Sequence, residues 1–250
     1  MPRLGQDTTE MTQSQIGGST FQFSAAKIDN LGATEYTLAD LIFDCSGSTD
    51  PYRAGMTRAL KEIIKSLRKA PRADNLLVRV SVFDTHAKEF HGYKPLMDCN
   101  EADYDAALYD GGSTALFDAG YTAIKAQTQY AKDLATKDYQ VNGIVMIATD
   151  GEDNASRVTA KMMGDALQEA KKTEALESIM TILVGVNVGS GGSLTSYLDN
   201  LKVQAGLQQF VPLPDADEKT LSRLAQFVSK SVSSQSQALG TGGPSASITI

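Results

Sequence analysis

The chain has 250 residues, of which 42% are hydrophobic, and this length and composition suit one globular domain with terminal segments. Its formal net charge of −7 argues against a general nucleic-acid-binding protein, because such proteins carry a basic surface. No apolar stretch approaches the roughly 18 residues of a membrane span, and the polar N-terminus lacks the apolar segment of a secretory signal. We therefore expect a cytoplasmic protein without a membrane-spanning segment.

Residues 1–35 are expected to form an N-terminal polar arm with one possible extra strand. Residues 1 to about 19 are rich in Gln, Thr, Ser and Gly, which is typical of a segment that is flexible or ordered by a partner. Residues 21–24 alternate polar and apolar side chains like a short strand. Such a strand could extend the edge of a sheet or dock on a neighbouring molecule.

Residues 36–234 are expected to form the folded domain, because strand and helix patterns alternate along them. Strands are predicted at about 37–44, 76–84, 87–91, 142–149, 178–187 and 209–213, and helices at about 50–69, 115–135, 157–174, 193–204 and 217–234. Runs such as 144–147 and 179–184 are largely apolar, as in strands that are buried on both faces. This alternation predicts an α/β fold with a doubly wound, mostly parallel sheet and helices on both faces.

One predicted strand cannot be parallel to its neighbour. The strand at 87–91 follows the strand at 76–84 after a very short link, whereas a parallel crossover needs about a dozen residues. We therefore predict a hairpin, with a short antiparallel strand at one edge of the sheet.

Three short segments carry oxygen-bearing side chains next to apolar runs or glycines. The segment 44–48 has Asp-x-Ser-x-Ser spacing after the run 41–43, 111–116 is a glycine-hinged loop, and 147–151 places a carboxylate after a second apolar run. Mg²⁺ prefers an octahedron of oxygen ligands at about 2.0–2.1 Å, part of which water can fill. Five side chains are therefore candidate ligands of one divalent cation: Asp44, Ser46, Ser48, Thr114 and Asp150.

Each segment by itself also has a purely structural interpretation. Asp44, Ser48 or Thr114 could cap the helix that follows it, and Asp150 with Gly151 could form an ordinary turn. These interpretations leave unexplained why all three segments end up at one edge of the sheet. Ligands of open α/β sheets bind at that edge, beyond the carboxyl ends of the strands. The combination therefore favours a metal site.

In this order, the three segments resemble the metal-ion-dependent adhesion site (MIDAS) of the von Willebrand factor A (vWA) domain family. The resemblance covers about residues 36–234, and none of the five ligand positions of the family is missing. It implies that Ser46 and Ser48 bind the ion directly, and that Thr114 binds it directly or through water. Asp44 and Asp150 would supply charge, often through water. The expected cation is Mg²⁺, with Mn²⁺ or Ca²⁺ as alternatives.

The resemblance also implies how the protein would act. A Glu or Asp from a protein partner would complete the coordination of the ion, so the chain would be an interaction module and not an enzyme. Intracellular members of the family often work beside AAA+ ATPases, which makes such an ATPase a possible partner by analogy. No residue of this sequence identifies the partner.

Two other functions stay open at this point. The chain could be a structural subunit of a larger homo- or hetero-assembly that joins its neighbours through the terminal arms. A Mg²⁺-dependent phosphohydrolase with Asp44 as nucleophile is less well supported, because position 46 is Ser and not a second Asp, and no Walker-type loop is present.

The C-terminal residues 235–250 are expected to form a polar tail, because Ser, Gln and Gly are frequent there. Residues 247–250 alternate and have β-propensity, so they could add to a sheet edge of their own or of a neighbouring molecule. Cys45 and Cys99 do not make a disulfide framework. Cys45 lies between two candidate metal ligands, and we expect its side chain to point into the core.

Overall fold

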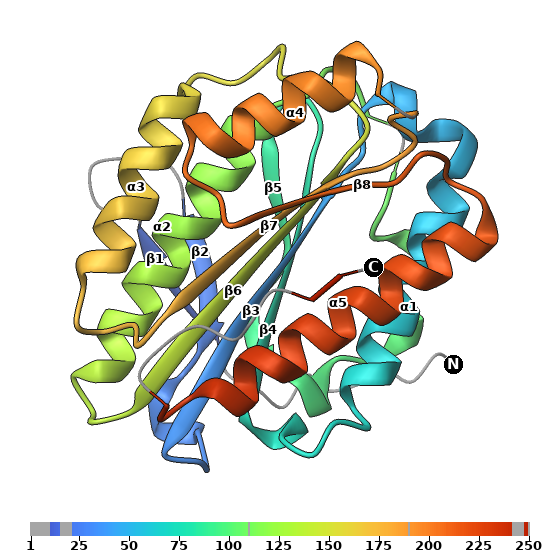
Figure 1. Ribbon diagram of the computed structural model, residues 1–250. Coiled ribbons are helices and arrows are strands. Elements are labelled where there is room, and N and C mark those ends of the chain that lie inside the picture. The colour runs from blue at the N-terminus through green and yellow to red at the C-terminus, as the bar shows by residue number, and fades with distance from the viewer. Residues whose placement is uncertain (1–10, 16–21, 110, 190, 242–247, 250) are drawn as a thin grey trace.

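A mostly parallel sheet of eight strands forms the centre of the molecule (Figure 1). The computed structural model describes residues 11–15, 22–109, 111–189, 191–241 and 248–249. The strands lie in the order β1-β2-β5-β4-β3-β6-β7-β8. Their bounds are β1 Met11–Gln15, β2 Gln22–Ala26, β3 Glu35–Asp44, β4 Leu76–Phe83, β5 Ala87–Pro95, β6 Gln140–Thr149, β7 Ile179–Gly185 and β8 Gln209–Pro212.

Helices cover both faces of this sheet, so the doubly wound α/β fold predicted from the sequence is confirmed. Helices α1 (Arg53–Leu67) and α5 (Glu218–Ala238) pack on one face, and α2 (Leu116–Ala135), α3 (Ala160–Lys172) and α4 (Ser193–Gln204) pack on the other (Figure 1). Short 3₁₀ turns complete the connections: η1 Ile28–Asn30, η2 Gly47–Tyr52, η3 Ala73–Asn75, η4 Leu96–Asp98 and η5 Glu101–Ala106. Among the described helices, none is both long and apolar enough to cross a membrane.

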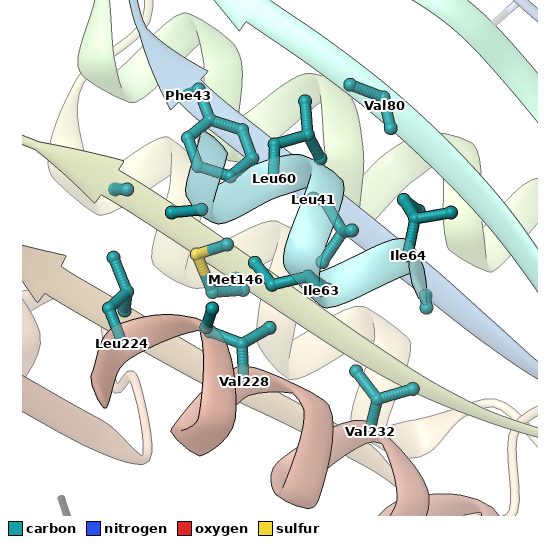
Figure 2. Packing of buried hydrophobic residues seen from close by; sticks show 14 of the residues in the cluster. Leu41, Phe43, Leu60, Ile63, Ile64, Val80, Met146, Leu224, Val228 and Val232 are labelled. Atoms are coloured by element: carbon teal, nitrogen blue, oxygen red, sulfur yellow. The ribbon is translucent and has the colours of Figure 1, made fainter. Parts of the chain in front are cut away.

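The apolar stripes of α1 and α5 meet the central strands in one core (Figure 2). On α1 the buried residues include Leu60, Ile63 and Ile64, a spacing that places them on one face of a helix. They pack with Leu41 and Phe43, which point from β3 toward the same side. Every residue of β4 is buried, as expected for a strand that is covered on both faces. This core determines where the ends of the central strands lie.

The N-terminal strands extend the sheet beyond β5. Strand β5 is antiparallel to β4, as predicted. It does not lie at the edge of the sheet, because β2 pairs with it in parallel through Ala25 and Tyr93. A Cβ on Gly92 would come within 1.9 Å of the Ser24 carbonyl oxygen, so this close approach requires glycine. Strand β2 coincides with the strand pattern noted at 21–24, of which residue 21 lies outside the described part of the chain.

Part of the expected flexible arm is a strand. Residues 11–15 form β1, which pairs antiparallel with β2 along its whole length. Composition could not show this, because the polar residues of β1 are ordered by backbone pairing and not by burial of apolar side chains. The remainder of the arm, residues 1–10 and 16–19, lies outside the described residues.

The expected C-terminal tail begins inside a helix. Helix α5 continues to Ala238, and Gln235 is fully buried. The Gln235 Nε2 atom donates to the Gly143 carbonyl (3.1 Å) and to Ser178 Oγ (2.9 Å), and Asn142 Nδ2 donates to the Gln235 carbonyl (2.6 Å). Residues 235–238 therefore belong to the folded domain, because they continue α5 and the buried Gln235 side chain finds hydrogen-bond partners inside it.

The end of the chain returns to the other edge of the sheet. The Gln209 Nε2 atom, on β8, donates to the carbonyl of Ile248 (2.6 Å), and Ile248 packs against the core that α1 and α5 share. Residues 248 and 249 are not in a strand, and residues 242–247 and 250 lie outside the described part. The predicted addition of a strand from 247–250 is therefore not seen at the described positions.

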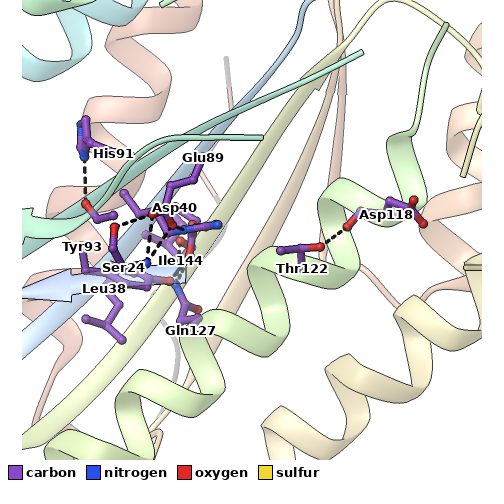
Figure 3. Close-up of polar contacts among 12 residues, drawn as sticks. Ser24, Leu38, Asp40, Glu89, His91, Tyr93, Asp118, Thr122, Gln127 and Ile144 are labelled. Atoms are coloured by element: carbon purple, nitrogen blue, oxygen red, sulfur yellow. Dashed lines mark hydrogen bonds and ion pairs between the residues drawn. The ribbon is translucent and has the colours of Figure 1, made fainter. Parts of the chain in front are cut away.

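A charged network is buried in the middle of the sheet (Figure 3). Arg79 on β4 is 2% exposed, and its Nη1 contacts Asp40 Oδ1 on β3 (2.9 Å) while its Nε contacts Glu89 Oε2 on β5 (2.7 Å). The Tyr93 hydroxyl donates to the other oxygen of Asp40. Glu89 also accepts the backbone N–H of Ser24 (3.0 Å), which attaches β2 to the sheet. The guanidinium of Arg79 thus pairs with one buried carboxylate, Asp40, and one half-buried carboxylate, Glu89.

Candidate metal site

The candidate site lies where two adjacent parallel strands end. Asp44 is the last residue of β3, and Asp150 follows Thr149, the last residue of β6. Phe43 lies opposite Ala148 in the register of this pair, so the two chain ends emerge side by side. Strand β3 leads into α1 on one face of the sheet, whereas β6 leads into α3 on the other face. This is the topological switch point, where ligands of such sheets bind.

Asp44 is buried and held in one orientation. Its Oδ1 accepts the backbone N–H of Ser46 (2.7 Å), and its Oδ2 accepts the Thr149 hydroxyl (2.6 Å). Burial raises the pKa of Asp44, the hydrogen bonds from Ser46 and Thr149 oppose that rise, and the negative charge of Asp150 adds to it. Asp44 therefore brings a charge to the site that the fold only partly compensates.

The two serines connect Asp44 with Asp150. Ser46 Oγ and Ser48 Oγ are 3.1 Å apart, and Ser48 Oγ donates to Asp150 Oδ1 (2.7 Å). The 3₁₀ turn η2, which begins at Gly47, brings these hydroxyls together at the end of β3. The Asp-x-Ser-x-Ser spacing thus places its side chains beside the second carboxylate, which lies far away in the sequence.

Tyr52 contacts the site, although no motif in the sequence points to it. It is the last residue of η2 and is half-buried, and its hydroxyl donates to Asp150 Oδ2. Burial raises the pKa of Tyr52, and the hydrogen bond to Asp150 raises it further, so the phenol keeps its proton. The only sequence signal for this residue is its place in the turn that follows Ser48.

The loop that carries Thr114 packs closely on the turn after Asp44. A Cβ on Gly111 would come within 2.4 Å of the Cys45 carbonyl oxygen, so the approach of the two loops requires glycine at that position. The N–H of Gly47 donates to the Gly112 carbonyl (3.0 Å). The glycines predicted as a hinge therefore act by permitting a close backbone contact.

Thr114 itself is attached to the segment that follows Asp150. Its N–H donates to Asn154 Oδ1 (2.7 Å), and the N–H of Asn154 donates to the Thr114 carbonyl (2.9 Å). Its side-chain oxygen lies 3.5 Å from the position of a Cβ on Gly151. Within the described part of the chain, no group forms a hydrogen bond to the Thr114 hydroxyl, which leaves its lone pairs free.

The two acidic residues after Asp150 have different environments. Glu152 is exposed at the rim, as expected for a residue that adds negative potential there. Asp153 Oδ1 accepts the N–H of Phe117 (3.2 Å) and the hydroxyl of Ser156 (2.5 Å), so this residue fastens the loop to the start of α2. Cys45 is fully buried in the core on the α1 side, which confirms the direction predicted for its side chain.

The donor set suits a hard divalent cation. The structure joins Asp44, Ser46, Ser48 and Asp150 by hydrogen bonds and places Thr114 beside them. Neither carboxylate forms an ion pair with a described Lys or Arg. No cluster of three or more His, Cys, Asp and Glu that could hold a metal occurs among the described residues. Hydroxyls and water would therefore have to supply most of the ligands, as Mg²⁺ accepts.

Comparisons with known proteins find the fold but no close relative. No protein-family model matches the chain, and no curated protein matches it. A D319A mutant of the PilB minor pilin from Streptococcus sanguinis has a TM-score of 0.60 at 14% identity, over 88% of this chain and 66% of that one. Proximal thread matrix protein 1 from the mussel byssus, with a zinc-occupied MIDAS motif, has a TM-score of 0.53 at 20% identity, over 80% and 46%.

A third structure is similar to the chain in fold, again at low sequence identity. The pilus adhesin SpaC from Lactobacillus rhamnosus GG, in an open conformation, has a TM-score of 0.54 at 10% identity, over 82% of this chain and 30% of that chain. The chain thus spans less than half of the byssus protein and of the adhesin, and about two thirds of the pilin. At these identities the likeness establishes the fold, which is that of vWA domains.

Proposed function

We propose that this chain is a metal-dependent protein-interaction module, in which a divalent cation at the ends of β3 and β6 binds an Asp or Glu of a partner. The observation that carries this proposal is the hydrogen-bonded set of Asp44, Ser46, Ser48 and Asp150, which holds two carboxylates that pair with no Lys or Arg among the described residues. A zinc-occupied MIDAS in a byssus protein of the same fold supports a metal at this edge.

The side chains divide into two roles. Ser46, Ser48 and Thr114 would hold the ion through their hydroxyl oxygens. As the resemblance implies, Asp44 and Asp150 would act through water, and the hydrogen bonds to both oxygens of each carboxylate hold them in place. Bound Mg²⁺ supplies positive charge, and neutral hydroxyl ligands leave much of that charge uncompensated. The site therefore attracts a carboxylate from outside, which is what a partner would bring.

The same arrangement gives no support to hydrolysis of phosphate esters. Such an enzyme needs a cation to bind the phosphate and an acid or base near its nucleophile. In the turns around the site, Arg53 is paired with Asp50 (2.5 Å) and Lys88 with Asp84 (3.0 Å). We therefore propose a binding function without catalysis, in the cytoplasm, with an AAA+ ATPase as one partner suggested by the resemblance to intracellular vWA proteins.

A structural subunit is the second candidate function, and one observation favours it. Strand β1 is the outermost strand of the sheet on its side, and its other edge is unpaired among the described residues. Such an edge can accept a strand from another chain. Light scattering after size exclusion, in Mg²⁺ and then in EDTA, separates this function from the first, because an edge-to-edge assembly does not depend on metal.

Calorimetric titration with Mg²⁺ and Mn²⁺ tests the proposed metal site. We expect one site per chain in the wild type and no binding in Asp150→Ala, with the circular dichroism of the folded protein retained. Asp84→Ala is the matched control, because Asp84 directly follows β4 at the same edge but lies outside the proposed ligand set. It should bind metal like the wild type. A wild-type protein that binds neither cation would refute the proposal.

A native-host pull-down tests the partner's carboxylate. Proteins retained with Mg²⁺, and lost with EDTA or with Asp150→Ala, would support recognition through the ion. Equal retention under all three conditions would show that the partner binds another face of the domain.

A further inference from the structure

We infer that Tyr52 keeps Asp150 out of the inner coordination sphere of the ion and so reserves a coordination position for an external carboxylate. This inference rests on the proposed function and names the residue that regulates how the site divides its affinity between metal and partner. It concerns a side chain outside the five proposed ligands.

The geometry around Asp150 is specific. Ser48 Oγ donates to Oδ1 (2.7 Å), and the Tyr52 hydroxyl donates to Oδ2, so each carboxylate oxygen has its own donor. Ser48 can use its lone pairs for an ion while it donates its proton to Asp150. The Tyr52 hydroxyl lies on the other oxygen, and it therefore restrains the carboxylate from turning that oxygen toward the ion.

The backbone and the core hold the Tyr52 ring in place. The residue lies between Pro51, whose ring restricts the backbone, and Arg53, the first residue of α1. Its ring is partly buried against the core formed by α1, α5 and the central strands. The hydroxyl is thus held by packing, and its hydrogen bond to Asp150 does not depend on a flexible side chain.

Removing this donor should change the coordination in a definite direction. A carboxylate with a free oxygen is a strong direct ligand for a hard divalent cation. Once inside the coordination sphere, Asp150 would neutralise part of the charge of the ion and occupy one position. The metal would then be bound more tightly and an external carboxylate more weakly. If Tyr52 had a purely structural role, its removal would weaken the binding of both the metal and the external carboxylate.

Tyr52→Phe is the test variant, because it removes the hydroxyl and retains the packed ring. Tyr109→Phe is its matched control: the Tyr109 hydroxyl donates to Asp84 Oδ2 (3.1 Å), a phenol–carboxylate pair at the same edge but outside the proposed ligand set. Thermal unfolding of both variants verifies that the domain is folded.

Mn²⁺ serves as the metal probe and acetate as the carboxylate probe. Free Mn²⁺ is measured by electron paramagnetic resonance, and the water bound to the ion by proton relaxation. We expect Tyr52→Phe to bind Mn²⁺ about tenfold more tightly, a change at the low end of those caused by partners of metal ligands. The ion in Tyr52→Phe should also retain fewer bound waters, and acetate should displace less of this water than in the wild type. Tyr109→Phe should behave like the wild type in all three measurements.

Three results would overturn the inference. Unchanged or weaker Mn²⁺ binding by Tyr52→Phe, with a wild type that binds, would refute the role of Tyr52 and leave the proposed function standing. Equal tightening in Tyr109→Phe would show that the effect is not specific to Asp150. A wild type that binds no Mn²⁺ would refute the proposed function and this inference with it.

Discussion

Asp40 and Asp44 lie on the same strand, β3, and each belongs to a cluster with a second carboxylate and a tyrosine. Around Asp40, Arg79 pairs with both carboxylates and Tyr93 donates to Asp40, all beneath the covering helix α2 (Figure 3). Around Asp44, the second carboxylate is Asp150, which has a tyrosine donor as well but no cation paired with it in the described part of the chain. Each cluster thus contains two carboxylates and a tyrosine, but only the Asp40 cluster contains, among the described residues, a cation that balances their charge.

This difference separates a structural cluster from a binding cluster. In the middle of the strand, Gln127 of α2 donates to the backbone carbonyls of Leu38 (2.9 Å) and Ile144 (3.2 Å), so the surroundings of Asp40 are fully enclosed. At the end of the strand, loops leave the sheet and Ser48 is exposed. Charge that is neutralised inside the protein holds strands together, whereas uncompensated charge at an open edge is available to a ligand.

The largest expected effect is on the enclosed cluster. Arg79→Met would leave the buried Asp40 and the half-buried Glu89 without their shared cation, and we expect it to lower the free energy of unfolding by about 3–5 kcal/mol. Urea denaturation measures this loss. Arg72→Met is the control, because Arg72 pairs with Glu35 where both side chains are partly exposed, and the expected loss there is below about 1 kcal/mol. Equal losses in both variants would contradict the distinction between the two clusters.

A smaller effect should appear as pH dependence. Burial raises the pKa of Asp40 to about 6 from an ordinary value of 3.8, and the opposing attraction of Arg79 is shared with Glu89. The folded protein therefore holds this proton more tightly than the unfolded chain. Its contribution to stability is present below about pH 4 and is lost as the pH rises to about 6. Relative to Asp40→Asn, the wild type should lose roughly 2–3 kcal/mol over this range.

Urea denaturation of both proteins at several values between pH 4 and pH 7 measures this change. The comparison with Asp40→Asn cancels the titration of carboxyl groups elsewhere, including those such as Asp84 whose pKa is lowered in the folded protein. A stability difference that grows with rising pH would show that the pairing with Arg79 outweighs burial at Asp40.

The smallest effect on stability is expected at the open edge. Asp150→Asn removes the repulsion between two carboxylates, so without added metal the free energy of unfolding should change by less than about 1 kcal/mol, in the stabilising direction. The same substitution should abolish the stabilisation that Mg²⁺ gives the wild type through binding. Thermal unfolding with and without Mg²⁺ measures both quantities. A loss of several kcal/mol without metal would place Asp150 among the structural carboxylates.

The sequence indicated the order of the central elements because their patterns are local. Strands buried on both faces are continuous apolar runs, and α1 repeats its apolar residues at helical spacing. The short link before β5 was sufficient to predict an antiparallel strand. The ends of the chain were harder, because β1 is ordered by pairing with β2, and Gln235 is buried through hydrogen bonds to Gly143 and Ser178. In both segments the polar composition is like that of a flexible terminal tail.

At the candidate site, the sequence alone determined which oxygen-bearing side chains follow the strands: Asp44, Ser46 and Ser48 from one turn, Thr114 after two glycines, and Asp150 after β6. Only the tertiary structure decided which charges are already neutralised. The pairing of Arg79 with Asp40 depends on strand register, and the contact of Tyr52 with Asp150 joins residues far apart in the chain. Charge balance depends on distances in space. A sequence pattern indicates such distances only between residues of the same short, regular segment.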